Sequence, residues 1–263
     1  MMILKILRND ISRVVRTRLP YFGIAAVWLV CVIIFIFTSS LRNSQAINAW
    51  GFMGFSLQGA FADVGMVFII IFSTLLISEE TGSGTIRMVL SSPVLRVEFY
   101  IAKILTGILY MIAMSVSALI VSYILGTFHF DFTAVEDAAG LVYTRREVLL
   151  NFIFAFFLSW VPLTALVTYG IFLSACIQKP GSALGVSIGI LIFVETLKHF
   201  VNISQYVCTT YIGTSWVIFH EVAQGVNYQW FPEIWRALGV SAVYIVVSLF
   251  AGLLVFSRRD LNQ

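Results

Sequence analysis

Six long apolar windows run through this chain of 263 residues and constrain its fold more than any other feature. An α-helix rises about 1.5 Å per residue and the hydrocarbon layer of a bilayer is about 30 Å thick, so about 17–25 apolar residues cross it as a helix. The windows cover residues 20–38, 61–78, 101–125, 149–175, 182–200 and 237–256. The sequence therefore predicts an all-α integral membrane protein with six transmembrane helices in a single domain, residues 1–263.

The composition excludes an ordinary water-soluble domain. Hydrophobic residues make up 60% of the chain and charged residues 11%, whereas soluble domains are about 45–50% apolar and about 25% charged. The first window is also longer than the apolar core of about 7–15 residues in a secretory signal, and no clear small-x-small cleavage pattern follows it. We therefore interpret residues 20–38 as a transmembrane helix.

The positions of the basic residues predict which way the helices run. Six spans place both termini on one side of the membrane, and the cytoplasmic side carries the excess of Lys and Arg. Of the 16 Lys and Arg residues, 11 fall on the side of the termini, which leaves five on the other side: Arg42, Arg145, Arg146, Lys198 and Arg236. We therefore expect both termini in the cytoplasm and the protein in the cytoplasmic membrane of a prokaryote.

Residues 1–18, before the first window, have the periodicity of an amphipathic helix. The apolar face carries Leu4, Leu7, Ile11, Val14 and Val15, and the opposite face carries Lys5, Arg8, Arg13 and Arg16. Such a helix lies along the inner leaflet, with its cations near anionic headgroups. The sequence predicts an interfacial helix; the alternative is a disordered basic tail that only fixes the orientation of the spans.

Two longer segments are expected on the outer side. Residues 201–236 are rich in Tyr and Trp, which favour the membrane interface, so we expect one or two short re-entrant or interfacial helices there. Residues 126–147 carry several acidic side chains and are expected to form ordinary solvated polypeptide.

The segment between the second and third windows predicts a short cytoplasmic helix. Glycines follow Glu79 and Glu80, Thr85 can cap a helix that reaches Leu90, and Pro93 ends that helix because it lacks an N–H group. A short helix of this kind can bed in a groove of a partner and move with it. The alternative is a solvated turn whose charges only stop the spans from sliding.

The same segment reads Glu80-x-x-x-Gly84-Thr85-Ile86-Arg87-x-x-Leu90-x-x-Pro93-x-x-Arg96-x-Glu98-Phe99 and is followed by Lys103. This pattern resembles the signature of the ABC-2 type transporter permeases. The closing residues 256–261 resemble the common end of those permeases, and the six-span layout with an amphipathic N-terminal helix covers nearly the whole chain.

The resemblance implies a permease that dimerises, here as a homodimer, with each copy engaging a separate ABC ATPase subunit, two in all. In that family the signature segment contacts the ATPase. Its counterparts here are Glu79, Glu80, Gly84, Thr85, Arg87, Leu90, Pro93 and Arg96. ATP and Mg would bind the partner ATPase. The short connection over residues 39–60 argues against a role that needs a large outer domain.

No enzyme chemistry is expected on this chain. It contains no Gly-x-x-x-x-Gly-Lys-Ser/Thr phosphate loop, so another chain must hydrolyse ATP. His129, His199 and His220 are dispersed, and the three cysteines show no metal-ligand spacing. We expect no catalytic residue, no cofactor, no metal and no nucleic-acid partner.

Charged residues within the windows suggest a transport path. Asp63 begins the second window, and Glu195 and Lys198 can pair at the end of the fifth because they are three residues apart. We interpret the three as a candidate gate or substrate path; the alternative is that they only end the spans. Gly181, Gly185 and Gly189 share one helix face and favour close helix packing, within the chain or against a second copy, and packing within the chain is preferred.

Three functions follow as hypotheses. The first is an ATP-driven exporter subunit whose substrate is an amphipathic peptide, antibiotic or lipid. The second is an ATPase-coupled membrane subunit that transmits force to an extracytoplasmic partner without moving a solute. The third is an ion-coupled secondary transporter, which usually needs ionisable residues near mid-membrane or interrupted helices in matching halves, and neither is evident in the sequence.

Overall fold

The computed structural model describes residues 2–41, 48–84, 95–137, 140–201, 203–226, 230–231 and 233–258. Within these residues, six helices are long and apolar enough to cross a membrane, which confirms an all-α membrane architecture of six spans. The six run over Leu19–Ser40, Ala49–Gly82, Arg96–His129, Arg145–Cys176, Pro180–Lys198 and Glu233–Arg258.

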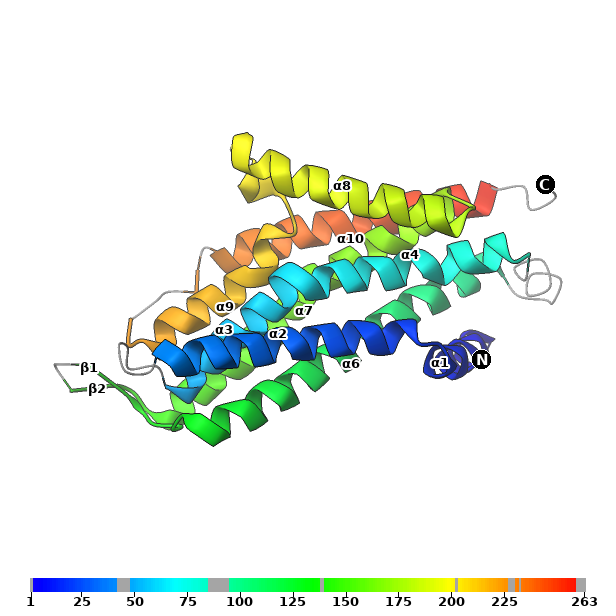
Figure 1. The fold of residues 1–263 in the computed structure, drawn as a ribbon. Helices are drawn as coiled ribbons and strands as arrows, with labels where there is room; N and C mark the ends of the chain where they lie inside the picture. Colours follow the sequence, from blue (N-terminus) through cyan, green and yellow to red (C-terminus); the bar gives the residue numbers. More distant parts are fainter. Residues whose placement is uncertain are drawn as a thin grey trace.

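The helices lie side by side in an elongated bundle (Figure 1). The elements follow in the order α1 (Met2–Arg16), α2 (Leu19–Leu41), α3 (Ala49–Gly59), the π-helix η1 (Ala60–Gly65), α4 (Met66–Gly82), α6 (Arg96–His129), β1 (Val135–Asp137), β2 (Gly140–Tyr143), α7 (Arg145–Cys176), α8 (Pro180–Phe200), η2 (Ser204–Tyr206), α9 (Thr210–Ala223) and α10 (Glu233–Arg258). α1 and the last turn of α10 lie at one end, here called the α1 end. The hairpin of β1 and β2 lies at the opposite end, the hairpin end.

The second span is longer than its apolar window indicates. α3, η1 and α4 form one continuous helix of 34 residues, Ala49–Gly82, so the predicted start at residue 61 is wrong. The first turns are less apolar, but burial compensates, because Trp50, Phe52 and Met53 are buried in the core. Asn48 caps the helix: its Oδ1 accepts from the Gly51 amide at 2.7 Å, and its Nδ2 donates to the Ala223 carbonyl at 3.0 Å.

Residues 126–147 and the connection between the last two spans contain regular structure. α6 continues to His129, and an antiparallel hairpin follows it, where the sequence predicts only ordinary solvated polypeptide. A short helix does occur between the last two spans: α9 has 14 residues and is too short to cross a bilayer. It packs against α3 and α7, with Trp216 and Phe219 fully buried.

α7 is the central helix and packs against α4, α9 and α10. Its contact with α4 is close because Gly170 has no side chain. A Cβ at Gly170 would lie 2.7 Å from the Ser73 Cβ and 3.3 Å from the Ile70 carbonyl oxygen. The backbone carbonyl cannot move away as a flexible side chain can, so this contact fixes how near the two spans lie.

Gly170→Ala should therefore destabilise the fold by about 1–3 kcal/mol through overpacking. The measurement is the midpoint of thermal unfolding of the purified protein in detergent. Gly239→Ala is the matched control, because no described atom outside the adjoining residues and the helix's own backbone lies within 4 Å of a Cβ built there. Equal midpoints for the two variants would contradict the packing of α4 on α7.

Candidate functional site

The N-terminal helix α1 turns away from the axis of α2 at the α1 end and packs along α6 (Figure 1). Part of its expected apolar face packs against the bundle, and the other part is exposed. Leu7 and Val14 are half-buried, whereas Leu4, Ile11 and Val15 are exposed, Leu4 to 67%. The helix therefore has an apolar edge that the rest of the described chain does not cover.

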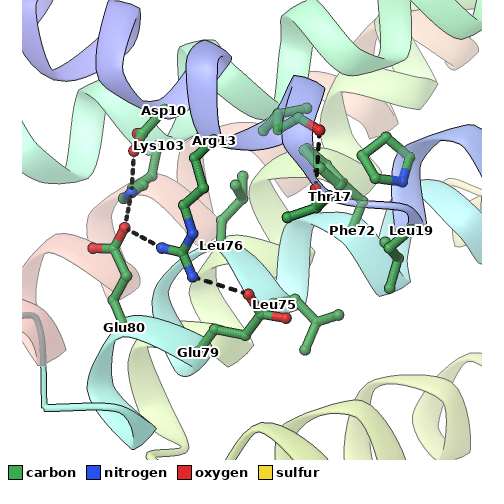
Figure 2. A pocket seen from close by; sticks show the side chains of 12 residues that line it. Asp10, Arg13, Thr17, Leu19, Phe72, Leu75, Leu76, Glu79, Glu80 and Lys103 are labelled. Atoms are coloured by element: carbon green, nitrogen blue, oxygen red, sulfur yellow. Dashed lines mark hydrogen bonds and ion pairs between the residues drawn. The ribbon is translucent and has the colours of Figure 1, made fainter.

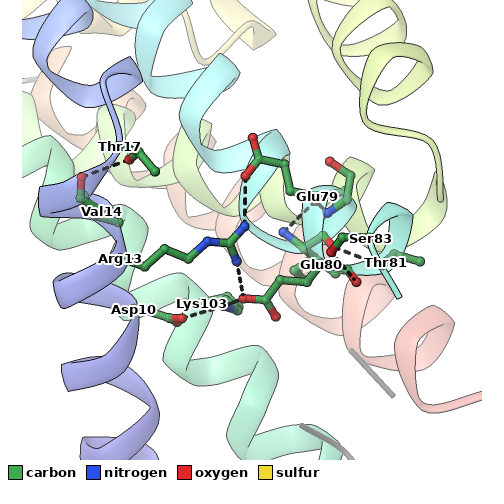
Figure 3. A network of polar contacts seen from close by, with 12 residues as sticks. Asp10, Arg13, Val14, Thr17, Glu79, Glu80, Thr81, Ser83 and Lys103 are labelled. Carbon is green, nitrogen blue, oxygen red and sulfur yellow. Dashed lines mark hydrogen bonds and ion pairs between the residues drawn. The ribbon is translucent and has the colours of Figure 1, made fainter. Parts of the chain in front are cut away.

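A buried charge cluster joins α1 to the second and third spans. The Lys103 ammonium lies 2.8 Å from Asp10 Oδ1 on α1 and 2.6 Å from Glu80 Oε1 in the last turn of α4 (Figure 3). Asp10, Glu80 and Lys103 are all buried, and Lys103 is only 1% exposed. The ammonium also lies 5.0 Å from the centre of the Phe99 ring, a favourable cation–π position. One cation thus binds two elements that are far apart in sequence.

Arg13 extends this cluster toward solvent. Its guanidinium donates to Glu80 Oε1 at 2.9 Å and to Glu79 Oε2 at 3.2 Å, and it lies one helical turn after Asp10, on the same side of α1. Two carboxylates in the last turn of a helix are unfavourable, because the helix dipole is negative there. Arg13 and Lys103 offset that charge. We call Asp10, Arg13, Glu79, Glu80 and Lys103 the basal charge cluster.

A buried ion cluster fixes the relative positions of the helices that it joins more than it raises the free energy of unfolding. Desolvating the ions offsets most of their attraction, but removing one partner leaves an uncompensated buried charge. The second Asp10 oxygen lies 3.4 Å from the Thr106 hydroxyl, which shares its one hydrogen between this oxygen and the closer Ala102 carbonyl at 2.9 Å. The cluster therefore holds α1 at one register against α4 and α6.

A small cavity adjoins the cluster beneath the turn between α1 and α2 (Figure 2). Its volume is about 60 Å³, enough for a few water molecules. Arg13 and Glu79 line its polar side, and Phe72, Leu75 and Leu76 line its apolar side. Its size suits hydration of the cluster and not a ligand of appreciable size.

The structure places the predicted coupling residues in three groups. Glu79 and Glu80 belong to the basal charge cluster, so Glu80 is bound within its own chain and is not on the surface. Gly84 is exposed with a φ of +73°, and Arg96 donates to the Ser257 carbonyl at 2.7 Å, which ties the start of α6 to the end of α10. The remaining members, Thr85, Arg87, Leu90 and Pro93, lie outside the described residues.

A second site lies toward the hairpin end, where one open cavity of about 510 Å³ brings Asp63, Glu195 and Lys198 together. Lys198 and Glu195 form an ion pair, which confirms the expected pairing, and the Thr209 hydroxyl also donates to Glu195. Glu233, at the start of α10, lines the same cavity. Asp63 lies on η1, in the interior of the long second span, so its expected place at the beginning of that span is wrong.

The glycine face of α8 does not pack within the chain. No described atom outside the helix backbone and adjoining residues lies within 4 Å of a Cβ built at Gly181, Gly185 or Gly189. The preference for packing within the chain is therefore wrong for the part of the chain that the structure describes. The face is left free for lipid or for another protein.

Comparison with known families adds one finding to this geometry. A family model described as "Protein of unknown function (DUF2705)" matches residues 20–262. The chain belongs to the DUF2705 family. A search of curated proteins finds none that matches this chain. The region matched to DUF2705 contains Glu80 and Lys103 of the basal charge cluster and all four charged residues of the cavity, whereas Asp10 and Arg13 precede it.

Sequence reasoning missed the roles of Asp10, Arg13 and Glu233. Asp10 is the one acidic residue of α1, and it lies one turn from both Leu7 and Val14, on the apolar side of the helix. An acidic residue on an apolar helix face is the feature of the sequence that could have indicated its role. The sequence places Arg13 on the polar face of α1, but it does not show that this part of the face borders α4, where Arg13 pairs with Glu79 and Glu80. Glu233 had no signal, because it lies before the sixth apolar window and is brought to the cavity only by the fold.

Lys103→Met should destabilise the protein strongly, because Asp10 and Glu80 then stay buried without their common cation. Breaking a buried ion pair in this way costs about 3–5 kcal/mol. Adding Asp10→Asn to Lys103→Met should recover part of the loss, because it removes the charge left without a cation, whereas Glu80 still pairs with Arg13. The measurement is thermal unfolding in detergent, with Arg8→Met, at an exposed cation of α1, as the control. A Lys103→Met variant as stable as Arg8→Met would contradict the buried cluster.

Proposed function

We propose that the chain is the membrane-spanning permease subunit of an ABC-2 type exporter, working as a homodimer with two separate ATPase subunits. The resemblance of residues 80–103 to the ABC-2 signature motivates this assignment. The observation that supports it is the basal charge cluster, which joins both ends of the signature segment, at Glu80 and Lys103, to one another and to α1. A lever that receives force needs such a rigid base.

In this proposal the segment between Gly84 and Arg96 docks into the ATPase as a coupling helix. Force on the segment reaches α4 through Glu80 and α6 through Lys103, because the two side chains share one ion pair. α1 moves with them through Asp10 and Arg13. Arg96 adds α10 through its hydrogen bond to Ser257. ATP and Mg bind the ATPase, and this chain supplies no catalytic group.

The α1 end then faces the cytoplasm, in agreement with the excess of Lys and Arg near it. α1 lies in the inner membrane interface, with Leu4, Ile11 and Val15 in the acyl boundary. Lys5, Arg8 and Arg16 are exposed on the same helix and face anionic headgroups. α9, toward the hairpin end, is a re-entrant helix whose buried polar backbone is shielded by α3 and α7.

The unpacked glycine face of α8 is where a second copy would pack. Small residues let two helices approach closely in a bilayer, and only 17% of the apolar window of α8 is buried within one chain. The cavity that contains Asp63 would be part of the export path. Its substrate is an amphipathic peptide, antibiotic or lipid. A subunit that transmits force without moving a solute would share the ATPase and lack the transport.

One observation favours a second candidate, an ion-coupled secondary transporter. Asp63 lies on a π-helical segment within the second span, and π-helical segments often mark functional sites in helices. An ionisable group within a span is the feature that such transporters use. Substrate uptake or release by vesicles that hold an ion gradient, with no ATPase present, would favour this candidate.

The exporter predicts that Leu90→Asp and Arg87→Glu abolish co-purification with the ABC ATPase encoded next to this chain. A charge at Leu90 would stop an apolar helix face from bedding in a groove, and reversal at Arg87 would remove a cation that the signature supplies. ATP hydrolysis by the purified complex is the second readout. It should fall to the rate of the ATPase alone.

Arg145→Glu is the matched control, because it also reverses a cation but does so at an exposed position at the hairpin end. It should leave both co-purification and hydrolysis unchanged. If the unsubstituted chain captures no ATPase, the exporter and the force-transmitting subunit are both wrong. If an ATPase binds but vesicles move no amphipathic solute on ATP addition, the force-transmitting subunit is favoured.

A further inference from the structure

The cavity toward the hairpin end is lined by charges from three separate parts of the chain. Asp63 comes from the second span, Glu195 and Lys198 from the end of α8, and Glu233 from the start of α10. We propose that this cavity binds a cationic amphipathic molecule, by holding an amine or guanidinium group between Asp63 and Glu233. The inference deepens the proposed function, on which it rests, by naming the charge of the substrate.

Two of the three carboxylates that line the cavity, Asp63 and Glu233, are not used in the ion pair of Lys198. Lys198 is paired with Glu195, and Thr209 also donates to Glu195. Asp63 and Glu233 make no ion pair or side-chain hydrogen bond with the described residues. The three acids and one amine give the lining a net charge of about −2 at neutral pH. A cleft of one sign with low-dielectric walls concentrates ions of the opposite sign, so the cavity favours cations.

The spread of these carboxylates favours an organic cation over a bare metal ion. Among the described residues, no three His, Cys, Asp or Glu side chains lie close enough to hold a metal. A metal needs several oxygens converging on one point, whereas an amine or guanidinium donates hydrogen bonds to acceptors spread around it. The apolar wall formed by Ala62, Met66 and Val217 can take the rest of an amphipathic molecule.

Unpartnered hydroxyls extend this polar lining. The Thr210 hydroxyl faces no hydrogen-bond partner among the described residues, although its oxygen is buried. A narrow recess shares Glu233 and Thr214 with the cavity and is lined by Ser215. Ser215 is only 2% exposed, and its hydroxyl also has no partner. A buried polar group normally has one, so these hydroxyls suit a ligand donor or the water that accompanies it.

The volume limits what can enter. A cavity of about 510 Å³ is within the range of about 300–1,000 Å³ that holds small-molecule ligands. It accommodates a small amphipathic amine or one cationic side chain of a peptide, but not a folded peptide. Lys198 does not make the site one for anions, because its charge is already neutralised by Glu195.

Binding of dansylcadaverine, a fluorescent primary amine on an aromatic body, tests this inference on the chain alone in lipid nanodiscs, with empty nanodiscs subtracted. The unsubstituted chain should bind it, and affinity should fall with added salt because the attraction is electrostatic. Asp63→Asn with Glu233→Gln should weaken binding about tenfold or more, equivalent to about 1.4 kcal/mol. The N-acetylated probe, which lacks the charge, should bind as weakly to both.

Asp131→Asn with Glu221→Gln is the matched control, because it also removes two carboxylates from the half of the chain near the hairpin end, and neither residue lines the cavity. It should bind the amine as the unsubstituted chain does. The single variants Asp63→Asn and Glu233→Gln keep the test decisive if the double variant unfolds. Equal affinity in the cavity variants and the control, or equal affinity for the acetylated probe, overturns the inference.

The outcome is separable from that of the proposed function, because no ATPase is present in this assay. If the ATPase co-purifies but the amine does not bind, the cavity inference fails and the exporter stands. If the amine binds but no ATPase is captured, the exporter fails and the cationic site stands.

Discussion

The contact between the Lys103 ammonium and the two buried carboxylates of Asp10 and Glu80 is the interaction on which the rest of the structure depends. Burying these three charges costs the free energy of their desolvation, and the attraction between well-placed ions must offset that cost. The geometry fixes position, because α1 is held at one place against the base of two spans. Without it, α1 would be joined to the bundle by the ion pairs of the partly exposed Arg13 and by a few half-buried apolar residues.

This arrangement gives α1 two different sides. One side carries Asp10 and Arg13 into the basal charge cluster, and the other carries the exposed side chains of Leu4, Ile11 and Val15. A load applied to the segment after α4 would therefore be shared between two spans and α1. Toward the hairpin end, the bundle contains a cavity with charged side chains in its lining. The long second span extends from the basal charge cluster to this cavity, which Asp63 on the π-helical segment η1 lines.

The spans could be predicted from sequence because crossing a bilayer imposes a length and an apolar composition on each helix. The start of the second span could not, because three glycines and Gln58 interrupt the apolar run of Ala49–Gly59, and only the fold shows that this stretch packs against α9. The basal charge cluster joins residues 93 and 23 positions apart, and no local pattern encodes such a pairing. Asp63, Glu195 and Lys198 could be selected one at a time, but only the fold shows that they share a cavity with Glu233.

The most direct test of the account is the distance between spin labels on Ser12 of α1 and Ser83 after α4, both exposed. It is measured by pulsed electron paramagnetic resonance in the complex with the ATPase, without nucleotide and with ATP trapped by vanadate. The account predicts one narrow distance that is the same in both states, and a broader distribution when Lys103 is replaced by Met. A distance that changes on trapping in the unsubstituted chain would contradict it, because α1 and the base of the second span would then move separately.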